Sequence, residues 1–61
     1  MNEKPKCRLY DLAGEIVATL PEYDPTVTVI TVPGGEGINR QYRATEEIDD
    51  DGYDIFREER A

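Results

Sequence analysis

Residues 26–32 read Thr-Val-Thr-Val-Ile-Thr-Val, so every residue of this stretch is β-branched. Side chains that branch at Cβ lose rotamer freedom in a helix and pack well on the pleated surface of a sheet. Apolar atoms fall on both faces of the stretch, which therefore predicts a central strand. Loops are predicted on both sides of it, because two prolines lie within residues 21–25 and a proline and three glycines lie within residues 33–37.

Residues 6–20 predict a β-hairpin. Asp11-Leu12-Ala13-Gly14-Glu15 lies in its middle, and an Asp that opens a type I turn is commonly followed by a Gly in the left-handed conformation. Residues two apart share a face of a strand. The apolar residues expected on the buried faces of the two arms are Cys7 and Leu9, then Ile16, Ala18 and Leu20.

A second hairpin is predicted around Asp51-Gly52, with its first strand running from about Ile38 to Ile48. A two-residue type I′ turn at Asp51-Gly52 places Ile48 opposite Ile55 and Glu46 opposite Arg57, with Asp49 against Asp54 as a like-charge cost. A longer turn that takes in Asp49 or Asp50 shifts this register by one or two residues. The tail from residue 57 is left open as strand, short helix or frayed chain. Four residues of the first strand are expected on one face: Ile38, Tyr42, Ala44 and Ile48.

Together these segments predict one all-β domain over residues 1–61. The expected architecture is an antiparallel meander of about five strands, forming a sheet or a partly open barrel, with at most a short C-terminal helical turn. A chain of this length buries only about 60% of its unfolded surface. With one Cys and no His it has neither an internal disulfide nor a structural zinc site. A partner or self-association is a reasonable source of further burial.

The charge of the chain is concentrated near its end. The whole chain carries 7 Lys and Arg against 14 Asp and Glu, a net charge of −7. Residues 46–61 contain eight of the acids and two arginines, or −6 of that total. This cluster predicts a surface that docks on a basic patch of a partner protein, where its carboxylates take the place of nucleic-acid phosphates. The competing interpretation is a solvated hairpin whose charge keeps the protein soluble. Its acids are Glu46, Glu47, Asp49, Asp50, Asp51, Asp54, Glu58 and Glu59.

Two tyrosines and two arginines complete the set of candidate site residues. Tyr23 lies between prolines and Tyr53 in the acidic segment. We expect both at the partner interface together with the first six acids of the cluster, although Tyr23 fits equally a role in covering one end of the sheet. Arg40 and Arg43 could contact an anionic ligand, or they could pair with the abundant carboxylates.

Several functions are disfavoured by the same residues. Asp49–Asp54 lacks the alternate spacing of an EF-hand loop, and residues 32–37 lack the Lys-Ser/Thr of a phosphate loop. No His is present, and the chain is too short to enclose an ordinary ligand cavity, so we expect no catalysis, cofactor or metal. The acidic balance disfavours direct binding to nucleic acid or anionic membranes. The lone Cys and the absence of a signal-like apolar stretch predict a cytoplasmic protein.

The expected function is therefore a non-catalytic acidic binding protein that acts as an inhibitor or adaptor. Small acidic proteins of this kind are often encoded by phages or mobile elements, and the basic surface they block can be one that binds nucleic acid. Two alternatives remain open. One is a homo-oligomeric assembly module that pairs through exposed strand edges, and the other is an anionic-ligand sponge formed between subunits.

Overall fold

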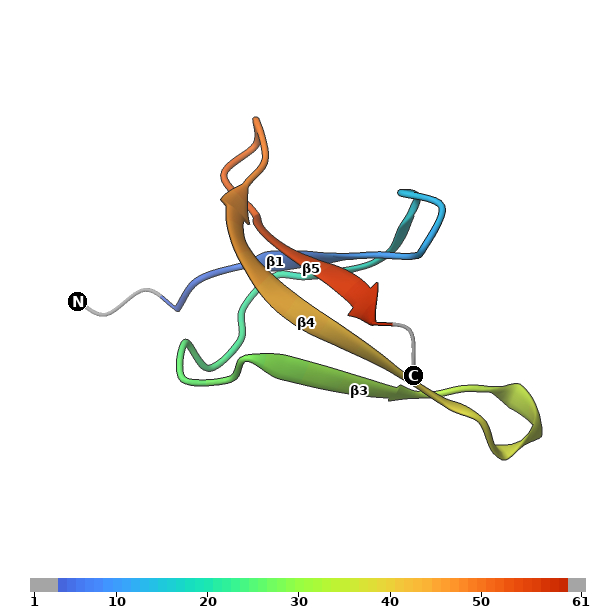
Figure 1. Cartoon of the computed structure of the whole chain (residues 1–61). Coiled ribbons are helices and arrows are strands. Elements are labelled where there is room, and N and C mark those ends of the chain that lie inside the picture. The colour runs from blue at the N-terminus through green and yellow to red at the C-terminus, as the bar shows by residue number, and fades with distance from the viewer. Residues whose placement is uncertain (1–3, 60–61) are drawn as a thin grey trace.

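The computed structural model describes residues 4–59, and it contains five strands and one short 3₁₀ turn (Figure 1). The strands form a single curled sheet with the shape of a half-barrel, so the predicted all-β fold is confirmed. Strand character continues to residue 59, and residues 60–61 lie outside the described part of the chain. The elements are β1 (Cys7–Tyr10), β2 (Ile16–Leu20), β3 (Val29–Pro33), η1 (Gly35–Gly37), β4 (Asn39–Ile48) and β5 (Asp54–Glu59).

The sheet is mixed, with the strand order β2-β1-β5-β4-β3. β1 and β5 run parallel and place Leu9 beside Phe56, whereas all other neighbours are antiparallel. The predicted antiparallel meander is wrong at this junction, because β5 inserts beside β1 and residues 21–28 carry the chain from one edge of the sheet to the other. β1 and β5 each have a neighbouring strand on both sides. They contribute the three most buried side chains, those of Cys7, Leu9 and Phe56.

β3 is an edge strand, so the prediction of a central strand for residues 26–32 is wrong in position. Pro33 lies within the strand, and proline has no N–H for a second neighbouring strand, which confines it to edges. The strand also starts later than the β-branched stretch. The Asp24 side chain accepts hydrogen bonds from the Thr26 N–H and hydroxyl, and the Val27 N–H donates to the Asp24 carbonyl.

The first predicted hairpin is confirmed. β1 and β2 pair antiparallel, with Leu9 opposite Ala18 and a register shift next to Tyr10, where β2 contains an extra residue. Ala18 and Leu20 pack against the core, whereas Ile16 is 52% exposed. The bulge therefore takes Ile16 off the face that the simple alternation assigned to it.

The second hairpin has the longer of the two predicted turns. The Asp49 N–H donates to the Tyr53 carbonyl and the Gly52 N–H to the Asp49 carbonyl, which makes Asp49–Tyr53 a five-residue turn. The register of the two-residue turn is therefore wrong, and Ile48 faces Asp54. A second irregularity follows between Ala44 and Ile48, where Glu46 has a φ of +67°. As a result Glu47, and not Glu46, contacts Arg57.

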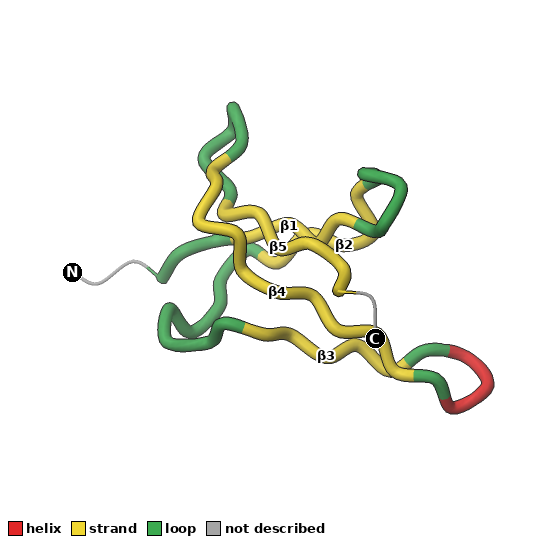
Figure 2. Tube along the Cα trace, viewed as in Figure 1, coloured by secondary structure: helices red, strands yellow, loops and turns green. Residues whose placement is uncertain are grey.

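The hydrophobic core lies on the concave face of the sheet. Cys7, Leu9, Tyr42 and Phe56 are almost fully buried there, and half-buried side chains surround them. Of the four residues expected on one face of β4, only Tyr42 and Ala44 belong to this core, since Ile38 and Ile48 are more than 60% exposed. Figure 2 shows the turns projecting from both ends of the curl, with η1 beyond β3. Within residues 4–59 no helix is long and apolar enough to cross a membrane.

Candidate binding surfaces

The acidic turn at Asp49–Tyr53 is ordered by its own first residue. Asp49 Oδ1 accepts hydrogen bonds from the N–H groups of Asp51 and Tyr53, both at 2.9 Å. Gly52 has a φ of +86°, a conformation that a side chain would strain. Asp49 was predicted to contact a partner, but its carboxylate is used inside the turn.

Arg8 fastens this turn to β1. Its Nη1 lies 2.6 Å from Asp49 Oδ2 and 3.0 Å from Asp51 Oδ2. Its guanidinium carbon is 4.0 Å from the centre of the Tyr53 ring, and Lys6 Nζ is 4.4 Å from the same centre. Tyr53 is thus in contact with two cations of its own chain. Burial acts to raise the pKa of Asp49, but the Tyr53 N–H, the Arg8 guanidinium and the Asp51 N–H together hold it below its ordinary value.

Tyr23 and Asp54 form a contact across one end of the core. The Tyr23 hydroxyl donates to Asp54 Oδ2, and the Tyr23 ring meets Phe56 edge-on with 5.3 Å between ring centres. Burial first, and then the hydrogen bond to Asp54, raise the pKa of Tyr23. Burial and the nearby Asp54 charge raise the pKa of the Cys7 thiol to about 11, so it is protonated at neutral pH. Tyr23 therefore covers one end of the sheet, the second of its two predicted roles.

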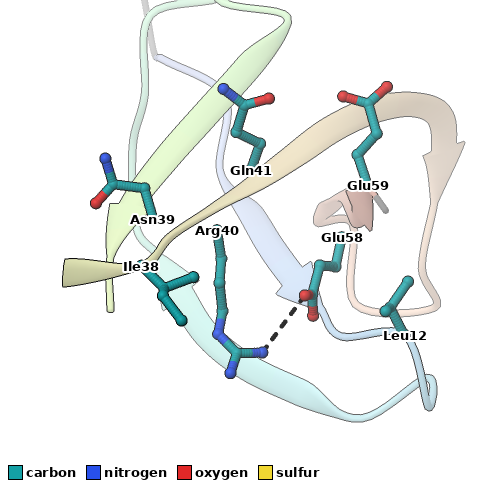
Figure 3. A pocket seen from close by; sticks show the side chains of 7 residues that line it. All are labelled: Leu12, Ile38, Asn39, Arg40, Gln41, Glu58 and Glu59. Atoms are coloured by element: carbon teal, nitrogen blue, oxygen red, sulfur yellow. Dashed lines mark hydrogen bonds and ion pairs between the residues drawn. The ribbon is translucent and has the colours of Figure 1, made fainter. Parts of the chain in front are cut away.

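The two candidate anion-binding arginines have carboxylate neighbours in the same chain. Arg43 Nε lies 2.6 Å from Glu59 Oε1, and Arg40 Nη1 lies 3.4 Å from Glu58 Oε2. Arg40 and Glu58 contribute to the lining of an open hollow of about 450 Å³ at the other end of the half-barrel (Figure 3). An anion bound there would have to compete with Glu58 for the guanidinium. The remaining lining residues are Leu12, Ile38, Asn39, Gln41 and Glu59.

Four of the predicted acids remain exposed at the end of the β4–β5 hairpin. Asp51 contacts Arg8 and Glu47 contacts Arg57, yet both carboxylates are more than half exposed. Between residues 4 and 59, the side chains of Glu46 and Asp50 have no hydrogen-bonding or ion-pairing partner. The hairpin end projects away from the rest of the sheet (Figure 1). We refer to Glu46, Glu47, Asp50 and Asp51 as the acidic tip.

The sheet also has two open edges, and their backbone groups are a second candidate surface. On β3, the Thr28 carbonyl accepts from Ala44 and the Gly34 N–H donates to Ile38. Because alternate residues of a strand point to the same neighbour, Val29, Thr31 and Pro33 direct their backbone groups away from the sheet.

The edge at β2 follows the same alternation. The Lys6 carbonyl accepts from the Asp54 N–H, so Cys7 and Leu9 direct their backbone groups toward β2. Thr19 and Pro21 consequently point outward, whereas Val17 is the extra residue at the register shift, where the alternation is interrupted. Neither edge strand contains a charged residue. The sequence contained a signal for β3, because Pro33 comes directly after the β-branched stretch and a proline within a strand indicates an edge.

No group of three or more His, Cys, Asp or Glu side chains positioned to hold a metal ion occurs within residues 4–59. Comparison of the chain with models of known families, with curated proteins and with solved structures finds no match.

Proposed function

We propose that this chain is a non-catalytic binding protein that docks its acidic tip on a basic surface of a partner protein. The supporting observation is the ordered turn beneath the tip. Asp49 and Arg8 hold the turn in one conformation, so little conformational freedom is lost when its exposed carboxylates meet a partner. A phosphate-binding cleft offers the kind of basic surface that such carboxylates fit.

The proposal divides the predicted partner-binding residues into two groups. The acidic tip makes the contact, whereas Asp49, Asp54, Tyr23 and Tyr53 support the hairpin from within. A role as an inhibitor or adaptor in the cytoplasm, encoded by a phage or mobile element, belongs to the same proposal. The single Cys, with its raised pKa, is compatible with a reducing compartment.

The test compares two double variants with the same change in charge. Glu46→Gln with Asp50→Asn neutralises two carboxylates of the acidic tip, and Glu15→Gln with Glu22→Gln neutralises two exposed carboxylates elsewhere. Each immobilised protein is exposed to lysate of the host cell in which it is made, at low and high salt. The tip variant should lose roughly tenfold in affinity for the retained partner, since each exposed ion pair contributes about 0.2–1 kcal/mol.

Wild type and the Glu15/Glu22 variant should retain the same partner, and retention should fall as salt rises. Equal retention by the two double variants, or binding that salt does not weaken, would contradict docking through the acidic tip.

A second candidate function, assembly through strand edges, is favoured by a different observation. Natural edge strands are commonly protected by charges, yet neither β2 nor β3 contains a charged residue. The third alternative, an anionic-ligand sponge, has less support because Arg40 and Arg43 already contact Glu58 and Glu59.

A further inference from the structure

The two open edges differ in how well they could accept another strand. β2 contains a register shift beside Tyr10, and a bulge bends and twists an edge away from a partner. β3 pairs with β4 over five successive residues from Val29 to Pro33 without a shift. β3 is therefore the more regular edge, and Pro33 blocks pairing only at its last residue.

The charge distribution points to the same strand. Residues 25–45 contain Glu36, Arg40 and Arg43, a net charge of +1, so the remaining residues carry −8 and the chain as a whole −7. Two copies that each carry −7 repel one another most weakly where these positive segments meet. Residues 25–35 contain no charged side chain, so pairing along β3 opposes no like charges.

We propose, building on the assembly candidate above, that two copies of this chain associate by antiparallel pairing of β3 with β3. Pairing centred on Ile30 joins Val29 of each copy to Thr31 of the other, and this forms four backbone hydrogen bonds; centring on Thr31 forms four as well. The β-branched side chains of Val29 and Thr31 would then lie opposite each other on the outer face, a favourable cross-strand combination. The result is a continuous ten-stranded sheet with two-fold symmetry.

This arrangement stops at two copies and does not continue into a longer assembly. The same strand is used by both copies, and the edges left over are the bulged β2 strands, which resist further addition. A junction of one short strand per copy is small compared with a stable interface, so we expect weak association with a dissociation constant in the range of about 10–100 µM. Raising salt should strengthen it by screening the repulsion between the two net charges, the opposite of the salt dependence expected for docking of the acidic tip.

Two matched pairs of variants test the proposal. Thr31→Pro removes an outward N–H of β3 without touching its bonds to β4, and Thr19→Pro does the same on β2. Thr31→Lys and Thr19→Lys keep the backbone intact and change the net charge equally, so they decide the outcome if a proline variant fails to fold. The mass of each protein is followed by light scattering from about 1 µM to about 1 mM at low and high salt.

Wild type and both Thr19 variants should dimerise, more tightly at high salt, whereas both Thr31 variants should associate at least tenfold more weakly. A wild type that stays monomeric up to about 1 mM overturns both this inference and the assembly candidate. Equal weakening by Thr19 and Thr31 variants, or a dimer that survives all four, overturns pairing through β3 while leaving assembly in place. The acidic-tip variant, whose net negative charge is smaller by two, should dimerise at least as tightly as wild type, so the docking proposal stands or fails separately.

Discussion

The two hairpin turns, Asp11–Glu15 and Asp49–Tyr53, have the same backbone hydrogen bonds although only the Asp and the Gly are shared. In the first, the Asp11 N–H donates to the Glu15 carbonyl and the Gly14 N–H to the Asp11 carbonyl, each at 2.9 Å. Asp11 Oδ1 also accepts from the Ala13 and Glu15 N–H groups. The corresponding bonds of the second turn are 2.9–3.0 Å long. The two turns thus share the spacing Asp-x-x-Gly and its hydrogen bonds, although the two residues between the Asp and the Gly differ.

The turns differ in what lies around them. Arg8 binds Asp49 and Asp51 and stacks on Tyr53, so the second turn is tied to β1 across the sheet. No such cation reaches Asp11 within the described residues, and the adjoining Leu12 is 56% exposed. Local sequence thus determines the shape of both turns. The tertiary contacts of Asp49–Tyr53 should make this turn contribute more to the stability of the fold than Asp11–Glu15 does.

The largest difference should appear when the turn-forming Asp is removed. Asp11→Ala loses two side-chain hydrogen bonds and should lower the free energy of unfolding by about 1 kcal/mol, or the melting temperature by about 4–8 °C. Asp49→Ala loses the equivalent bonds and also leaves the half-buried Arg8 without its nearest carboxylate. Its melting temperature should therefore fall further, as measured by thermal denaturation.

Asp49→Asn separates the two contributions at this position. The amide oxygen can still accept the two N–H groups, but the charge that Arg8 contacts is gone. An intermediate melting temperature is expected. Equal losses for Asp11→Ala and Asp49→Ala would show that the Arg8 contact adds nothing to the second turn.

Acid should distinguish the turns less strongly. Because the pKa of Asp49 is lower in the folded protein than its ordinary value of about 3.9, its stabilising effect is complete above that value and is lost as the pH falls through the lower, folded pKa. Hydrogen bonds from Thr26 likewise lower the pKa of Asp24, and Arg43 lowers that of Glu59. Denaturant unfolding between pH 6 and pH 2 should thus show a flatter acid limb for Asp49→Asn than for wild type, though not a level one. Identical profiles would contradict a lowered pKa at Asp49.

The sequence predicted local features better than it predicted neighbours. Alternation and turn chemistry gave the strand content, the first hairpin and the alternative of a longer second turn. The parallel pairing of β1 with β5 could not be obtained in this way, since nothing in either strand specifies which distant strand lies beside it. The β-branched stretch was placed at the centre because its composition outweighed Pro33, whose missing N–H indicated an edge.

The candidate surfaces show the same division. Composition located the acidic cluster, but it could not show which carboxylates bind groups of the same chain and are therefore not free to contact a partner. Asp49 and Asp54 lie only a few residues from Asp50, and their different roles depend on Arg8 and Tyr23, which approach from other parts of the chain. The open edges of β2 and β3 were missed as specific sites because strand order has to be known before an edge can be located.

The smallest difference between the turns is expected at their glycines. Gly14 and Gly52 have φ values of +84° and +86°, and an added Cβ would meet nothing within 4 Å at Gly14 and only Lys6, at 3.8 Å, at Gly52. Alanine at either position should therefore cost about 1–2 kcal/mol, because only the left-handed backbone conformation opposes it. Equal losses in denaturant unfolding would confirm that the two backbones are equivalent. A markedly larger loss for Gly52→Ala would mean that the added methyl group displaces Lys6 from Tyr53, so that the tertiary contacts of the second turn depend on its backbone as well as on Asp49.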